Sequence, residues 1–264
     1  MAALIALRDS SDHKQKTAAA AELRDNLDAL ITPDAFQPLV DCLESLLLHT
    51  PPVFVNVSPQ QARLCAPYAD LQKLRYTLLE IIHRLPLTDV LKPHVKQILQ
   101  LMNKVIRTDN EDNAMLCLKV IIDLHKHFKS LVEDQVQPFL DLVQDIYRNM
   151  PQTVRESFDP LAVPFFSSPA EIQAPNPPSF QSPKATSPNP TGDSAEVALR
   201  NLSRGMASFK TLTECPIIVV LLFQNYRQCV AKNLLAFTLL IIEVVPVRLH
   251  THDIDAQAAT IPPG

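Results

Sequence analysis

Residues 71–86, LQKLRYTLLEIIHRLP, decide the fold class of this chain. Their apolar side chains recur at steps of three and four residues, which is the spacing of one face of an α-helix. The stretch ends at a proline, which cannot continue a helix. We therefore predict an amphipathic helix that buries one face against its neighbours. The residues on that face are Leu71, Leu74, Leu78, Ile81, Ile82 and Leu85.

The same spacing repeats outward from this stretch through the first 158 residues. It predicts helices over 13–30, from Pro33 to the Pro51-Pro52 pair, from Lys92-Pro93 to 107, and from the cap Asn110 onward. Their apolar faces contain Leu23, Leu27, Leu30, Phe36, Leu39, Val40, Leu43, Leu46, Leu47, Val95, Ile98, Met102, Val105, Cys117, Ile121, Leu124, Phe128, Val136, Phe139, Leu140, Val143, Ile146 and Tyr147.

These helices group into pairs at 13–48, 59–107 and 111–149. Ser58 and Gln61 have the form of a capping box at the start of the second pair, and residues 65–72 interrupt its first helix. The pairs repeat at about 40 to 50 residues, the period of HEAT and armadillo units. Because one pair alone exposes half of its apolar face, stacking the pairs is what buries a core. We predict an all-α, HEAT/armadillo-like α-solenoid of antiparallel helix pairs over 1–158.

Residues 159–207 break this pattern. Nine prolines lie between Pro160 and Pro190, mixed with Ser, Asn, Thr and Gln, and such a segment buries too little apolar surface to order itself. We predict one long disordered linker. A further helix pair is expected over 208–245, in which residues 216–223 are apolar on all sides and should be enclosed by neighbours. The tail, 246–264, has no periodicity.

Composition agrees with a helical fold and excludes several classes of protein. The chain has only 3 glycines in 264 residues, whereas hairpin turns and phosphate-binding loops both depend on glycine. The net charge of −4 does not favour binding to the phosphate backbone of a nucleic acid, which calls for clustered basic residues. No apolar run approaches the length of about 20 residues that spans a bilayer. We therefore expect a soluble intracellular protein with no direct nucleic-acid or membrane binding.

Two groups of polar residues could be read as sites. His125 and His127 lie two apart on a helix and so point to different faces, whereas a helical metal pair needs a spacing of three or four. We expect one at a helix interface and one in solvent. Asp109, Glu111 and Asp112 could form a cation or acid–base site, but at a helix N-terminus they fit capping and dipole complementation better.

Neither the cysteines nor the serines give a catalytic signature. The five cysteines have no disulfide or zinc spacing, and Cys117 lies on an apolar helix face, which indicates a core residue. Ser168, Ser182 and Ser187 each precede a proline within the linker. They are candidates for proline-directed phosphorylation, and a low-complexity spacer rich in Ser and Pro accounts for them equally well. We expect no enzyme, no metal and no cofactor.

Several short runs resemble the N-terminal HEAT region of the transcription-associated (TRRAP-type) proteins. They are LLEIIHRLP at 78–86, NEDNAMLCL at 110–118, IDLHKHF at 122–128, VQPFLDL at 136–142 and, after the linker, LTECPIIVVLL at 212–222. The resemblance covers about residues 15–158 and 208–245. It implies a helical scaffold from pseudokinase relatives of the phosphatidylinositol-3-kinase-like kinases.

The resemblance also implies a role. Such proteins are shared subunits of SAGA and nucleosomal histone acetyltransferase complexes in the nucleus, where transcriptional activators contact them. Residues 65–72 look inserted and the tail from Pro246 matches nothing in that pattern, which fits intron sequence in a gene model or a genuine short isoform. An unrelated HEAT or armadillo adaptor, such as a nuclear-transport or phosphatase scaffold, is the alternative. An active kinase fragment would need a phosphate-binding loop and a catalytic Asp, and the sequence has no motif for either.

Overall fold

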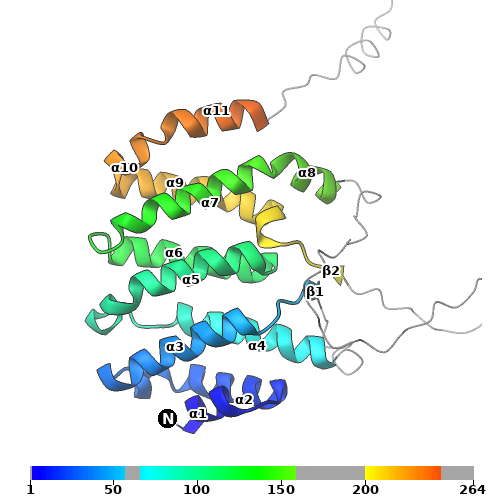
Figure 1. The fold of residues 1–264 in the computed structure, drawn as a ribbon, viewed down its shortest axis with the longest axis vertical. Coiled ribbons are helices and arrows are strands. Elements are labelled where there is room, and N and C mark those ends of the chain that lie inside the picture. Colours follow the sequence, from blue (N-terminus) through cyan, green and yellow to red (C-terminus); the bar gives the residue numbers. More distant parts are fainter. Residues whose placement is uncertain (1, 57–65, 159–199, 245–264) are drawn as a thin grey trace, which may run out of the picture.

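The computed structural model describes residues 2–56, 66–158 and 200–244. Within these ranges the chain is built from helices stacked in two layers (Figure 1). The helices before the linker are α1 (Ala2–Asp9), α2 (His13–Asp25), α3 (Pro33–His49), α4 (Ala66–His83), α5 (Val95–Thr108), α6 (Glu111–His127), α7 (Val136–Arg148) and α8 (Met150–Phe158). After it come α9 (Phe209–Asn225), α10 (Arg227–Ala231) and α11 (Leu234–Val244).

The longer helices alternate between the two layers. One layer stacks α2, α4, α6 and α9 on one another, and the other stacks α3, α5, α7 and α11. Figure 1 shows the stack rising from α1 and α2 at one end to α11 at the other. Short 3₁₀ helices at Leu27–Leu30, Asp89–His94, Glu133–Gln135 and Gly205–Ala207 connect the helices. This arrangement confirms the predicted α-solenoid.

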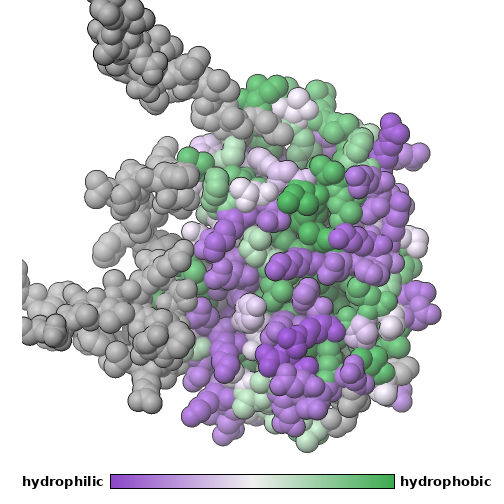
Figure 2. All heavy atoms as spheres, turned by 180° about the vertical axis from the view of Figure 1, so that it is seen from behind, coloured by the Kyte–Doolittle hydropathy of each residue, from purple (hydrophilic) through white to green (hydrophobic). Residues whose placement is uncertain are grey.

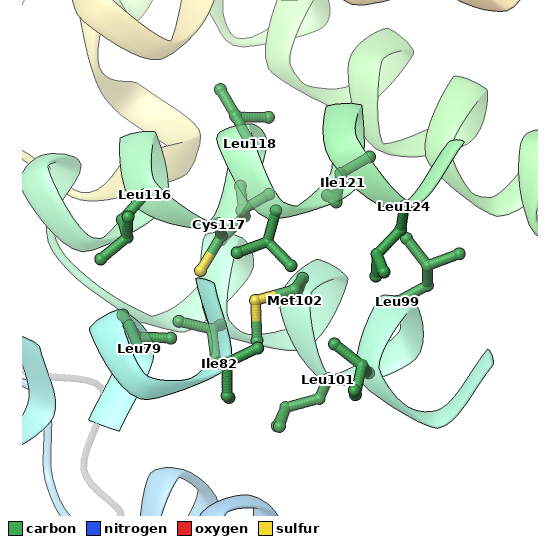
Figure 3. Packing of buried hydrophobic residues seen from close by; sticks show 14 of the residues in the cluster. Leu79, Ile82, Leu99, Leu101, Met102, Leu116, Cys117, Leu118, Ile121 and Leu124 are labelled. Carbon is green, nitrogen blue, oxygen red and sulfur yellow. The ribbon is translucent and has the colours of Figure 1, made fainter. Parts of the chain in front are cut away.

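The core runs continuously along the stack because each helix pair buries the apolar faces of the pair before it. In the middle of the molecule Leu79 and Ile82 from α4, Met102 from α5, and Cys117 and Ile121 from α6 meet side by side (Figure 3). All of them are buried. The predicted stripe residues of α3, α5 and α6 are likewise buried. Leu71 of α4 and Tyr147 of α7 are only partly buried.

Three helix boundaries differ from the prediction. Residues 2–9 form α1, which packs on α2 and was missed because eight residues are too few to show a clear period. The predicted helix over 13–30 ends at Asp25, and Leu27–Leu30 form a separate 3₁₀ helix. Residues 66–72 do not interrupt a helix: they are the first turns of α4, where the missing N–H of Pro67 costs nothing. Cys65 and the predicted capping box at 58–61 lie outside the described residues.

The end of the linker differs from the prediction of disorder over 159–207. Residues 159–199 lie outside the described residues, but 200–207 are ordered along the edge of the solenoid. There β2 (Arg200–Asn201) pairs antiparallel with β1 (Val55–Asn56), on the right-hand side of the helical stack in Figure 1. The ordering comes from backbone partners about 145 positions away in the chain, which local composition does not show.

The enclosure predicted for residues 216–223 is also wrong. Ile218 and Leu222 of α9 are buried, but Ile217 and Val220 are exposed. The reason is that α9 ends its layer: α6 packs on one side of it, and no described helix of the same layer follows on the other.

Candidate functional site

A buried ion pair lies where three connections of the solenoid meet. Arg75, in the middle of α4, is 1% exposed. Its Nε and Nη2 donate to Oδ2 of Asp109 at 2.8 and 2.6 Å. Its Nη1 donates to the carbonyl oxygens of Leu47, at 3.0 Å, and of Thr50. Arg75 therefore joins α4 to the end of α3 and to the turn between α5 and α6.

Asp109 uses its second carboxylate oxygen to organise that turn. Oδ1 accepts from the backbone N–H of Asn110 at 2.8 Å and from Nδ2 of Asn113 at 3.0 Å. The side chain of Asn110 caps α6 by accepting from the Asn113 N–H, as the sequence predicted. Its Nδ2 donates to the carbonyl of Val53 at 2.8 Å. Every acceptor of this buried carboxylate thus has a donor, the condition under which a buried charge is tolerated.

Residues 200–210, here called the return segment, run across this cluster after the linker. The Leu202 N–H donates to the Phe54 carbonyl at 2.7 Å, the Glu111 N–H to the Ser203 carbonyl at 2.8 Å, and the Gly205 N–H to the Asp109 carbonyl at 2.8 Å. Arg204 lies over the ring of Phe54, 5.4 Å from its centre, a cation–π distance. The return segment therefore binds two inter-helix connections at once.

The acidic residues of the predicted cluster serve the same junction. Oγ of Ser208 donates to Glu111 at 2.8 Å and caps α9 through the Lys210 N–H. Nζ of Lys210 contacts Glu111 at 3.0 Å and Asp112 at 3.1 Å, and these carboxylates raise the pKa of Lys210. Glu111 and Asp112 lie in the first turn of α6, as predicted, whereas Asp109 is the C-cap of α5 and the partner of Arg75. The cluster fixes α9 to α6.

The two histidines lie where the spacing placed them. His125 is 1% exposed and its Nδ1 is 3.1 Å from the hydroxyl of Tyr226, across the junction of α6 with the α9–α10 turn. Burial lowers the pKa of His125 to about 4 and raises that of Tyr226 to about 12. His127 is exposed. The prediction of one interface histidine and one solvent histidine is confirmed.

The remaining candidate residues either lie in the core or fall outside the described residues. Cys117 is fully buried, and burial raises the pKa of its thiol well above the usual value, which confirms it as a core residue. Among the described residues no group of three or more potential metal-ligating side chains gathers, and no helix there has both the length and the apolarity to cross a bilayer. Ser168, Ser182 and Ser187 lie outside the described residues.

Arg75 is the residue that sequence reasoning missed, although its signal was present. It lies four residues after Leu71 and three before Leu78, so it falls on the predicted apolar face of its helix. A charge in that position must be paired if the face is buried. Asp109 could not be recognised as the partner, because 34 residues separate the two and only the stacking of α4 on α6 brings them together.

The fold and this junction define a class of protein: a stacked helical repeat whose polar cluster holds repeats together. No family model matches the chain. It is 30% identical over 90% of its length to "Transcription-associated protein 1" of Drosophila melanogaster. It is 34% identical over 67% to the human "Transformation/transcription domain-associated protein", and 30% over 90% to the "SAGA complex/NuA4 acetyltransferase complex subunit Tra1" of Schizosaccharomyces pombe.

The chain therefore belongs to the family of transcription-associated proteins. It spans only 5 to 6% of the length of these relatives.

Proposed function

We propose that this chain is a non-enzymatic scaffold that contacts protein subunits of SAGA-type and nucleosomal histone acetyltransferase complexes in the nucleus, together with transcriptional activators. One observation carries the proposal: the relatives that match 90% of the chain include a subunit named for both complexes. The stacked-helix architecture supports it, since extended repeat surfaces are suited to binding other proteins. The same relatives disfavour the alternative of an unrelated transport or phosphatase adaptor.

The surface charges support protein partners over nucleic acid. Several basic side chains of the described helices are paired with acidic ones, among them Arg24 with Glu80, Lys96 with Asp134 and Arg107 with Asp145. Paired cations leave little positive potential to attract a phosphate backbone. We expect a labelled DNA duplex to show no change in fluorescence anisotropy when titrated with the chain at physiological salt.

The proposal is tested by affinity capture of the tagged chain from nuclear extract, followed by quantitative mass spectrometry. Acetyltransferase-complex subunits should be enriched, and excess untagged chain should compete them away. A tagged HEAT-repeat protein of similar size, from an unrelated family, controls for adhesion to helical repeats in general. Capture of transport factors or phosphatase subunits, with no acetyltransferase subunits, would instead favour the adaptor.

We further propose that Ser168, Ser182 and Ser187 accept phosphate from proline-directed kinases, since each precedes a proline. Phosphopeptide mapping of the chain expressed in cells tests this, with the Ser→Ala variants as matched controls for site assignment. Unmodified peptides covering all three serines in dividing and resting cells would leave the Ser-Pro steps as a spacer.

A further inference from the structure

A polar groove lies between two neighbouring repeats, at the ends of their helices. One wall is formed by residues 127–133, which follow α6, and the other by the turn at 225–228 between α9 and α10. We call it the α6–α10 groove. Its volume is about 470 Å³, which lies in the range of ligand sites in proteins. Figure 1 shows α10 at the left-hand edge of the stack, on the side away from β1 and β2.

Contacts behind the groove hold its two walls in place. Tyr226 is buried, and its hydroxyl lies 3.1 Å from Nδ1 of His125. On the other wall Phe128 is buried. Sγ of Cys229 donates to Oε1 of Glu133 at 3.4 Å and so joins α10 to the connection before α7. The groove is therefore built into the junction of the two repeats.

The groove has one fixed positive charge on each wall. Lys129 and Arg227 line it from opposite sides and are exposed, and neither has an ion-pair partner among the described residues. Glu133 is the carboxylate of the lining, and it already accepts from Cys229. Figure 2, in which this edge of the stack lies on the right, shows hydrophilic side chains gathered along its upper part. The groove is therefore suited to an anion.

These side chains match a phosphate better than a carboxylate. A phosphate monoester carries a charge of about −1.5 to −2 at pH 7 and has three acceptor oxygens, so Lys129 and Arg227 can bind it together. Ser130, Asn225 and Gln228 line the same groove and add neutral donors. A single carboxylate would leave one cation unmatched. Two cations are also too few to follow the run of phosphates along a nucleic acid, which calls for an extended basic face.

The place of the groove leaves it open to another protein. It lies at the side of the stack between two described repeats, so a repeat stacked beyond α11 would not lie over it. The chain's own linker ends elsewhere: the return segment bonds to Glu111 at the start of α6, whereas the groove begins at His127, the last residue of α6. A helix of 17 residues, about 25 Å long, separates the two.

We propose that the α6–α10 groove binds a phosphorylated serine or threonine in a segment of a partner protein, with Lys129 and Arg227 on the phosphate. This inference goes beyond the scaffold role and does not depend on it. Its test uses purified components, so it can fail while the capture of acetyltransferase subunits succeeds, and the reverse.

Fluorescence anisotropy of labelled peptide libraries, titrated with the unphosphorylated 264-residue chain, tests the proposal. Three libraries share the same randomised flanking positions and differ at one central position, which is phosphoserine, serine or glutamate. We expect the phosphoserine library to bind at least about tenfold more tightly than the other two, because only its central group carries enough charge for both cations.

Substitutions in the groove test the roles of its charges. Arg227→Gln and Lys129→Gln should each weaken binding of the phosphoserine library about tenfold. Glu133→Gln should strengthen it, since a like charge is removed from the groove. Lys14→Gln is the matched control: Lys14 is an exposed lysine of α2, at the opposite end of the stack, and its loss should leave binding unchanged.

Four results would overturn the proposal. Equal binding of the phosphoserine and serine libraries is one, and equal weakening by Lys14→Gln is another. Tighter binding of the glutamate library would assign the groove to an unmodified acidic partner, and displacement by a DNA oligonucleotide but not by inorganic phosphate would indicate a nonspecific surface for polyanions.

Discussion

At the scale of single residues, the Arg75–Asp109 pair departs most from the apolar pattern of the helix faces, because it places two charges in the interior. Arg75→Met removes the partner of a fully buried carboxylate and two further hydrogen bonds, to the carbonyl oxygens of Leu47 and Thr50. We expect a loss of about 3–5 kcal/mol in the free energy of unfolding, measured by urea denaturation. Arg84→Met is the control, because Arg84 is half exposed in its pair with Glu80 and should contribute below about 0.5 kcal/mol.

The combined variant Arg75→Met with Asp109→Asn removes both charges and keeps an acceptor oxygen for the Asn110 N–H and the Asn113 side chain. It should be more stable than Arg75→Met alone, because no buried charge is left unpaired. If the single and combined variants lose the same amount, the damage lies in the lost contacts to Leu47 and Thr50 and not in the orphaned carboxylate.

His125 makes stability depend on pH. Its pKa is about 4 in the folded chain, against 6.5 for an unburied histidine, so the unfolded chain binds the proton more readily between these values. Stability is therefore fully present above pH 6.5 and falls as the pH is lowered toward 4, by about 3 kcal/mol in total from this group. Urea midpoints measured at intervals from pH 7 to pH 4 follow the loss.

The contribution of His125 is isolated by difference. His125→Phe should flatten the profile between pH 6.5 and 4, whatever its overall stability, while the exposed His127→Phe should keep the slope of the parent. Parallel profiles for the parent and His125→Phe would show that His125 is accessible to protons in the folded chain.

At the scale of elements, the return segment depends on one glycine. A Cβ at Gly205 would lie 2.6 Å from Cβ of Ala114 and 2.6 Å from the carbonyl oxygen of Ile106, so the segment crosses α5 and α6 too closely for any side chain. We expect Gly205→Ala to destabilise the chain by on the order of 1–3 kcal/mol through overpacking. Thermal unfolding followed by circular dichroism measures the shift.

A second substitution separates the two contacts. Ala114→Gly, combined with Gly205→Ala, removes the side-chain clash but leaves the Ile106 carbonyl in place, so only part of the loss should return. Complete recovery would mean that the backbone of α5 yields easily, and that the return segment is held less tightly than its hydrogen bonds to Phe54, Asp109 and Glu111 indicate.

At the scale of the whole molecule, a stacked architecture should unfold from its ends. The middle helices α4, α5 and α6 pack against neighbours on both sides, whereas α1 and α11 each have described neighbours on one side only. Because each repeat is stabilised mainly by adjacent repeats, backbone amide hydrogen exchange should be slowest in α4–α6 and fastest in α1 and α11. The profile is read by mass spectrometry.

Uniform protection along the stack would contradict this expectation and would indicate a single cooperative unit.

Local sequence patterns were sufficient to predict the helical class, the buried faces of α3, α5 and α6, the cap at Asn110 and the opposite surroundings of His125 and His127. These features follow from the period of 3.6 residues and from side chains that bond within their own turn, so they are visible in short windows of sequence. The candidate site could be predicted only in pieces, since its acidic residues were recognised as helix-terminal but not as partners of Arg75 and Lys210.

Which residues contact one another depends on how the helices stack. The pairing of Arg75 with Asp109, the ordering of residues 200–207 on the α3–α4 and α5–α6 connections, and the exposure of Ile217 and Val220 all depend on which helix stacks on which. The sequence pattern of an apolar helix is the same whether or not a neighbouring helix covers it. Contacts between residues from 34 to about 145 positions apart are set by the packing of whole layers, and no local pattern encodes their partners.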